Sequence, residues 1–166
     1  MIVQTTWFFP QPPDAIWPLL CNARMEPTRS TLFGLGLPQP QQCRLPDGHG
    51  GVGSTRQCIS DRGTVEQTIL DWNEPHHLAF SMDRSDLYFR SWVISIVDDF
   101  ELARTPQGGT RATRTTSVQV IGWFRRLKQL ALWVGLRQIH RFVFRNWQRL
   151  AAAAPVSAAQ VPSGST

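Results

Sequence analysis

The sequence contains no apolar run long enough to cross a bilayer. In the apolar C-terminal stretch Trp123–Ala152, the longest uncharged run is Gln129–Leu136, only eight residues, whereas a membrane-spanning helix needs roughly 18–20. No block of five like charges occurs either, although the net charge is +5 and the pI is about 10.1. Because no recognised DNA- or RNA-binding motif accompanies the basic residues, we expect no nucleic-acid partner.

Cysteine is scarce, and the three cysteines, Cys21, Cys43 and Cys58, form no CxxC motif. An odd number cannot all pair, so we expect reduced thiols in the core or in strands, as is typical of a cytosolic protein. Met1 leads directly into an apparent strand, without a positively charged segment or a small-residue cleavage site. These observations argue against secretion and predict a cytoplasmic location.

Catalytic and metal-binding motifs are also missing. There is no GxSxG nucleophile elbow, and the glycine-rich stretch DGHGGVG, which includes His49, lacks the Gly-Lys-Ser/Thr of a phosphate-binding loop. His76 and His77 are adjacent at the start of a predicted strand, where neighbouring side chains point to opposite faces and cannot easily share a metal. We therefore expect no metal site, no cofactor and no catalytic residue of a recognised type.

What the sequence does contain is one long helical stretch near its end. Trp123–Ala152 has no proline and one glycine, Gly135, which favours a helix over its whole length. Before the glycine, the apolar residues point roughly opposite to those after it, so either the helix bends there or its two halves pack against different surfaces. After the glycine, the apolar face comprises Leu136, Ile139, Phe142, Val143, Trp147 and Leu150, and the basic face comprises Arg137, Arg141, Arg145 and Arg149.

The part of the chain before this helix predicts an antiparallel sheet. Short segments rich in β-branched and aromatic residues alternate with turns that contain glycine and proline. Two short helices are expected after the first strand, one from Pro13 to about Ala23 and one within Met25–Gly36. The predicted strands are Ile2–Phe9, Gln39–Leu45, Gly53–Ser60, Thr64–Trp72, His77–Met82, Leu87–Leu102 and Thr110–Ile121.

Such a sheet needs cover for one face, and the last helix is the only long apolar helix in the predicted element order. An antiparallel sheet that curls around a long helix tends to enclose a cavity. The expected fold class is therefore α+β, with about seven curved strands wrapped around the C-terminal helix. We assign residues 1–152 to one domain and residues 153–166, rich in Ala, Pro, Ser and Gly, to a disordered tail.

Three local motifs occur in a characteristic order. They are PPDAIWPLL at Pro12–Leu20, ILDWNEPHHLAF at Ile69–Phe80 and GGTRATRTT at Gly108–Thr116. Together they resemble the START-like superfamily, also called SRPBCC or Bet v 1-like, over about residues 1–152, and they look closest to the bacterial polyketide cyclase/dehydrase and lipid-transport group. The resemblance implies a helix-grip fold and a ligand-binding domain. Because the superfamily includes lipid and sterol carriers as well as aromatase/cyclases, the fold does not define the function.

Polar contacts inside a cavity would come from a few strand residues. Arg90, Arg114 and Gln67 are the candidates, because both arginines share strand parity with residues expected to face the helix. A buried arginine must find an acceptor. That acceptor is either an internal carboxylate, such as Asp71 or Asp98, or an oxygen atom of a bound ligand.

The sequence supports three functional hypotheses. The first is the binding or transport of a hydrophobic small molecule, such as a lipid, isoprenoid or polyketide-like compound, between the sheet and the C-terminal helix. The second is an aromatase/cyclase-type enzyme acting on a poly-keto substrate, which requires Arg90 or Arg114 to line the cavity without a carboxylate partner. The third is a membrane-docking module that uses Trp133 and the basic face of the helix. The candidate ligand-binding residues are Trp17, Gln67, Phe80, Met82, Arg90, Trp92, Ile94, Arg114, Leu136, Ile139 and Val143.

Overall fold

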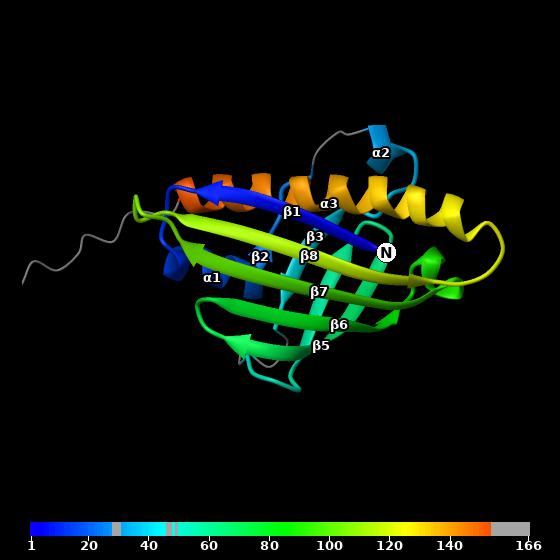
Figure 1. Ribbon diagram of the computed structural model, residues 1–166, viewed down its shortest axis with the longest axis horizontal. Helices are drawn as coiled ribbons and strands as arrows, with labels where there is room; N and C mark the ends of the chain where they lie inside the picture. The colour runs from blue at the N-terminus through cyan, green and yellow to red at the C-terminus, as the bar shows by residue number, and fades with distance from the viewer. Residues whose placement is uncertain (28–30, 46–47, 49, 154–166) are drawn as a thin grey trace, which may run out of the picture.

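The computed structural model describes residues 1–27, 31–45, 48 and 50–153, which form a curled antiparallel sheet and one long helix lying along it (Figure 1). Within these residues, the sheet has eight strands in the order β1-β8-β7-β6-β5-β4-β3-β2. The strands are β1 (Ile2–Phe9), β2 (Ala23–Arg24), β3 (Pro40–Arg44), β4 (Thr55–Ser60), β5 (Gly63–Asn73), β6 (His77–Ser85), β7 (Val93–Arg104) and β8 (Thr110–Val120). The helices are α1 (Pro13–Cys21), α2 (Thr31–Gly34), the 3-10 helix η1 (Tyr88–Ser91) and α3 (Arg125–Ala153).

The predicted α+β helix-grip architecture is confirmed. Each of the seven predicted strands is present, with ends that differ by a few residues. The additional strand, β2, has only two residues and pairs with β3, so no hydrophobic period could reveal it. The predicted strand Leu87–Leu102 starts too early, because η1 occupies four of its first residues and β7 begins only at Val93.

Helix α3 runs without interruption through Gly135, and its two halves face different surroundings. In the second half, Phe142 and Val143 are buried in the hydrophobic core. In the first half, Leu127 and Leu130 are 65% and 59% exposed. A Cβ atom at Gly135 would lie 2.8 Å from Leu37 Cδ1, so the glycine lets the segment before β3 approach the helix closely. The change of apolar phase at Gly135 thus coincides with the change from exposed to buried surroundings.

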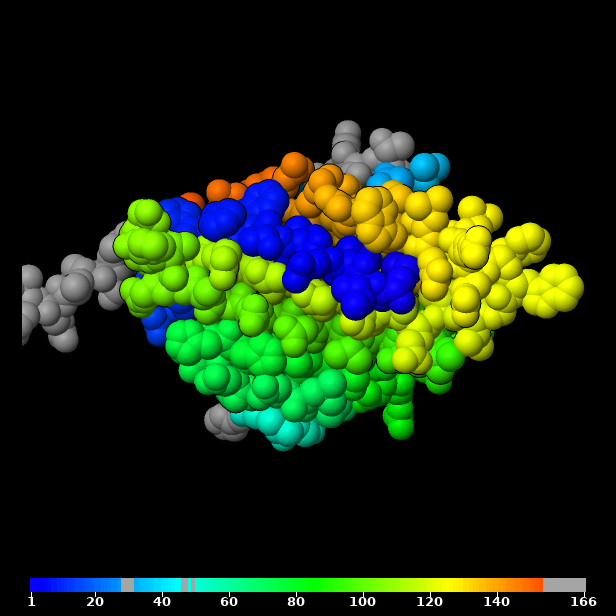
Figure 2. All heavy atoms as spheres, viewed as in Figure 1, coloured from blue at the N-terminus to red at the C-terminus, as the bar shows by residue number. Residues whose placement is uncertain are grey.

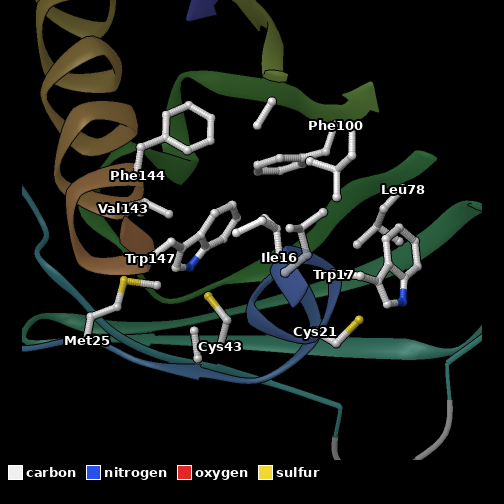
Figure 3. Packing of buried hydrophobic residues seen from close by; sticks show 14 of the residues in the cluster. Ile16, Trp17, Cys21, Met25, Cys43, Leu78, Phe100, Val143, Phe144 and Trp147 are labelled. Atoms are coloured by element: carbon white, nitrogen blue, oxygen red, sulfur yellow. The ribbon is translucent and has the colours of Figure 1, made fainter. Parts of the chain in front are cut away.

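Aromatic side chains fill the core under the second half of α3 (Figure 3). Phe144 and Trp147 project from the helix, and their ring centroids lie 5.6 Å apart. The Trp147 ring also lies 5.7 Å from Phe100 of β7, and Phe144 meets Phe9 of β1 edge to face at 6.1 Å. These contacts fix the helix to the sheet at one end of the molecule, because buried aromatic pairs add specific geometry to apolar burial.

The prediction that every cysteine is reduced is wrong for two of them. Cys43 of β3 and Cys58 of β4 form a disulfide. The antiparallel register places these residues directly opposite each other, with their Cα atoms 4.2 Å apart, and the spacing in the sequence does not reveal that pairing. Cys21 remains a free, buried thiol, and burial raises its pKa to about 11.

Three further expectations concern membrane-spanning helices, the C-terminal tail and His49. None of the helices in the described part of the chain is long and apolar enough to cross a membrane. The expected tail, residues 153–166, starts within α3, since the helix ends at Ala153, and its other residues lie outside the described part. The turn residue His49 also lies outside it.

Candidate functional site

A cavity of about 370 Å³ lies between the sheet and α3. Strands β3 to β8, η1 and α3 all contribute side chains to its wall. Pockets that bind small molecules typically enclose about 300–1,000 Å³ and have mostly apolar walls with a few polar groups. The cavity matches this description, because most of its wall is aliphatic and aromatic.

The two ends of the cavity differ in their access to solvent. At the closed end, Phe80, Phe100 and Trp147 are each no more than 2% exposed. At the open end, Tyr88 of η1 and Leu127 of α3 line the cavity but are 62% and 65% exposed. A molecule therefore has a route into the cavity between η1 and the first turns of α3, which lie together at one end in Figure 1.

Most of the residues predicted to bind a ligand lie in the cavity wall. The agreement follows from alternation along the strands and from the apolar stripe of α3, both of which depend only on regular geometry. Ligand contact by these residues stays a prediction. The predicted residues that line the cavity are Gln67, Phe80, Met82, Trp92, Arg114, Leu136, Ile139 and Val143.

Three of the predicted residues do not line the cavity. Trp17 belongs to α1 and is buried in the core, where it meets Trp72 edge to face at 5.1 Å. Arg90 lies in η1 and is exposed, because a 3-10 helix does not keep strand alternation. Ile94 is 61% exposed, because a register shift between Val93 and Ser95 turns its side chain to the outer face.

Arg114 lines the cavity but already has a carboxylate partner. Its Nε donates to Asp98 Oδ1 at 2.9 Å, and its Nη2 donates to Asp98 Oδ2 at 3.1 Å. The Thr116 hydroxyl also contacts Asp98 Oδ1. Burial alone would raise the pKa of Asp98, but the Arg114 guanidinium and the Thr116 hydroxyl outweigh burial, so the pKa lies below its usual value. The internal ion pair anticipated from the sequence is thus present.

His140 extends this buried network without reaching the cavity wall. Its Nε2 lies 2.8 Å from the Thr116 hydroxyl, and its Nδ1 lies 3.0 Å from the Thr5 hydroxyl. Burial, and then the nearby Arg114 charge, lower the pKa of His140 to about 3. The imidazole is therefore neutral at physiological pH and links α3 to β1 and β8.

Arg56 is a buried polar cavity residue that the sequence analysis missed. It is 3% exposed and lines the cavity beside Gln67. Its Nε and Nη2 donate to the backbone oxygen of Leu20, at 3.2 and 2.9 Å, and its Nη1 donates to Gln67 Oε1 and to Cys58 Sγ. The guanidinium carbon lies 4.4 Å from the centroid of the Phe80 ring. No carboxylate contacts Arg56 among the described residues.

These positions bear on the enzyme hypothesis and on metal binding. The cyclase hypothesis required Arg90 or Arg114 to line the cavity without a carboxylate partner, and neither residue does. Among the residues that the structure describes, no group of three His, Cys, Asp or Glu side chains is placed to hold a metal ion.

Solved structures share this architecture at low sequence identity. A START superfamily protein from Mycobacterium smegmatis has a TM-score of 0.62 and 9% identity, covering 91% of this chain and 97% of that chain. Ara h 8.0201 has a TM-score of 0.61 and 13% identity, with coverage of 92% and 97%. TTHA0849 from Thermus thermophilus has a TM-score of 0.66 and 13% identity, with coverage of 93% and 99%. No family model and no curated protein matches the sequence. The chain thus has the START-like, Bet v 1-like fold.

Proposed function

We propose that this START-like chain binds a hydrophobic small molecule, such as a lipid, isoprenoid or polyketide-like compound, between the sheet and α3. The observation that carries the proposal is the cavity of about 370 Å³, which is closed by aromatic side chains at one end and open at the other. Burial of an apolar ligand against these walls contributes about 25 cal/mol per Å². The open end supports a carrier role, because a ligand can enter and leave through it without unfolding of the core.

The cytoplasmic location stays a prediction. It depended on reduced cysteines and on the sequence at Met1, and the disulfide between Cys43 and Cys58 removes the first of these supports.

Filling the cavity tests the proposed binding function. Ile139 lines the cavity, so Ile139→Trp is expected to weaken binding of the neutral fluorescent probe Nile red by about tenfold or more, which is about 1.4 kcal/mol. Ile94→Trp is the matched control, because Ile94 is 61% exposed on the outer face. Fluorescence titration measures the affinities, and native mass spectrometry of the purified protein detects any retained ligand. A wild-type protein that binds neither Nile red nor extracted lipid contradicts the proposal.

A second candidate function is docking on an anionic membrane, and the exposed half of α3 favours it. Trp123 and Phe124 are 87% and 76% exposed and directly precede the basic residues Arg125 and Arg126. Figure 2 shows this segment, in yellow, projecting from one end of the molecule. The Phe124 backbone has φ 60°, a strained conformation for a non-glycine residue that is typical of functional sites. No Asp or Glu follows Glu101 in the sequence. Neither α3 nor the residues just before it therefore carry an acidic side chain that would repel anionic lipid.

The sequence hypothesis used Trp133 and the basic face of the helix for membrane docking, and the structure favours a different part of α3. Trp133 is 41% exposed, and the Arg137 guanidinium carbon lies 4.9 Å from its ring centroid. Farther along, Arg145 and Arg149 lie near the closed end, away from the cavity mouth, and Arg149 pairs with Glu26 at 3.6 Å. The aromatic and basic residues that border the open end are therefore the better candidates for membrane contact.

Vesicle sedimentation distinguishes the two surfaces. Arg125→Glu with Arg126→Glu is expected to abolish binding to vesicles that contain phosphatidylserine, since each basic residue near an anionic surface contributes about 1 kcal/mol. Arg145→Glu with Arg149→Glu, the matched control, is expected to retain most binding. Equal sedimentation of wild-type protein with and without phosphatidylserine would exclude electrostatic docking.

A further inference from the structure

Two guanidinium groups face the cavity, and only one of them has its charge balanced. Arg114 forms a two-point ion pair with Asp98. Arg56, which is more deeply buried, contacts a backbone oxygen, a side-chain amide and a disulfide sulfur, all of them neutral. A buried cation without a counter-charge is costly unless something else compensates it. Burial, and then the neighbouring Arg114 charge, lower the pKa of Arg56 to about 10, and the Asp98 carboxylate offsets them only in part.

Some hydrogen-bond donors in the cavity wall also lack an acceptor. A guanidinium has five N–H donors, and the four contacts of Arg56 leave one donor on Nη2 without an acceptor in the described residues. Trp147, in the cavity wall near Phe100, has a buried indole N–H with no hydrogen-bond partner among the described residues. The one cavity carboxylate, Asp98, already accepts from Arg114 through both oxygens. Two residues of the cavity wall, Arg56 and Trp147, therefore carry an N–H donor without an acceptor in the described part of the protein.

The charges that line the cavity add to this imbalance. Arg56, Arg114 and Lys128 are positive and Asp98 is negative, which leaves the described wall with a net charge of +2. Lys128 lies at the open end, with its Nζ 5.4 Å from the Trp92 ring centroid. Arg56 lies deep, over Phe80, and the Phe80 ring is 5.8 Å from Phe100. A single negative group beside Arg56 would therefore compensate a charge that no carboxylate contacts among the described residues.

We propose that Arg56 binds the carboxylate of an amphipathic acid whose apolar body occupies the rest of the cavity. This inference rests on the proposed binding function and narrows its ligand class. A carboxylate suits the site because it can accept a charge-assisted hydrogen bond from the one free Nη2 donor and also supply the negative charge. An alcohol would leave the charge of Arg56 unbalanced, and an amine would add a further cation. Gln67 holds the guanidinium in place from β5, and the Leu20 backbone oxygen holds it from α1.

Three ligands with the same tail and different head groups test this assignment. Decanoate, decanol and decylamine are compared by displacement of Nile red from the wild-type protein. Decanoate is expected to bind about tenfold or more tightly than decanol, and decylamine more weakly than both. Equal affinity for decanoate and decanol overturns the assignment to Arg56 but leaves the proposed binding function intact. Failure of Nile red and of the whole series to bind overturns both.

Two matched variants locate the head group. Arg56→Met is expected to remove the preference for decanoate while retaining decanol binding, because Met keeps much of the apolar volume. Lys128→Met, which removes the positive charge at the open end, is expected to keep the preference. The assignment is wrong if the preference survives Arg56→Met or disappears with Lys128→Met. If Arg56→Met does not fold, Arg56→Lys replaces it, and an unchanged preference in that variant contradicts the role of the planar guanidinium.

Discussion

The two halves of α3 have similar amino-acid types but opposite surroundings. In the second half, Phe144 and Trp147 are 0% and 1% exposed and pack against Phe9 of β1 and Phe100 of β7. In the first half, Leu127 and Leu130 are 65% and 59% exposed. The comparison shows that apolar residues of this helix serve two purposes. The second half holds the fold together, whereas the first half presents an apolar surface beside the cavity mouth, where folding does not require one.

The two arginines that line the cavity also differ, because only one of them contacts a carboxylate in the described part of the chain. The ion pair of Asp98 and Arg114, with Thr116 and His140 beside it, is satisfied within the protein. Arg56 has no such counter-charge among the described residues. A buried polar group whose partners lie within the protein stabilises the fold. A buried charge without such a partner is available to a ligand.

Truncating one phenylalanine in each half gives the largest expected contrast. Phe144→Ala is expected to lower the free energy of unfolding by about 4 kcal/mol, because it leaves a cavity among aromatic rings. Phe124→Ala is the matched control and is expected to change it by less than about 0.5 kcal/mol, because Phe124 is 76% exposed. Urea denaturation measures both values. Equal losses would show that the exposed half also stabilises the fold.

Removing the counter-charge of Arg114 has the next largest expected effect. Asp98→Asn is expected to cost about 3 kcal/mol, because it leaves a second unbalanced guanidinium beside Arg56. The pKa of Asp98 is lowered in the folded protein, so the stabilisation it gives is present above the unfolded pKa, about 3.9, and is lost as the pH falls through the folded pKa. Denaturation of wild type and variant at neutral and acidic pH measures the difference. A variant as stable as wild type at neutral pH contradicts the role of the pair.

Much of the fold and of the cavity wall could be predicted because they depend on regular alternation. The apolar stripe of α3 and the alternating strands placed Phe80, Ile139 and Val143 correctly in the wall. The errors at Arg90 and Ile94 have a local cause: parity can be counted only along an unbroken strand, and here η1 and a register shift interrupt it.

Arg56 could have been found from the same sequence. Only a short turn separates the predicted strands Gly53–Ser60 and Thr64–Trp72, and the observed register pairs Ser60 with Gly63 and Arg56 with Gln67. Because Gln67 was predicted to face the helix, its cross-strand partner should face the helix too. The disulfide is different, since it depends on how β3 pairs with β4 across a loop whose length does not fix the register.

The smallest expected effect concerns His77, where β6 begins. Its Nδ1 lies 2.7 Å from Asp71 Oδ2 and its Nε2 lies 2.9 Å from Asp99 Oδ2, so only the protonated ring donates to both carboxylates. Partial burial lowers the pKa of His77, but the hydrogen bonds to Asp99 and Asp71 outweigh burial and raise it above 6.5. The stabilisation is therefore fully present below the unfolded pKa, near 6.5, and is lost as the pH rises through the folded pKa.

His77→Gln is accordingly expected to be less stable than wild type at about pH 6 and to approach wild type at about pH 9. The difference should not exceed about 1 kcal/mol, because both carboxylates are partly exposed to solvent. Urea denaturation across this pH range measures it, and a difference that does not vary with pH would show that His77 contributes through packing alone. Because His77 pairs with Glu101 of β7 in the sheet and the first half of α3 contains no histidine, the same pH change should leave binding at the cavity mouth unaltered. A parallel change in Nile red affinity would instead mean that the sheet and the open half of α3 respond together.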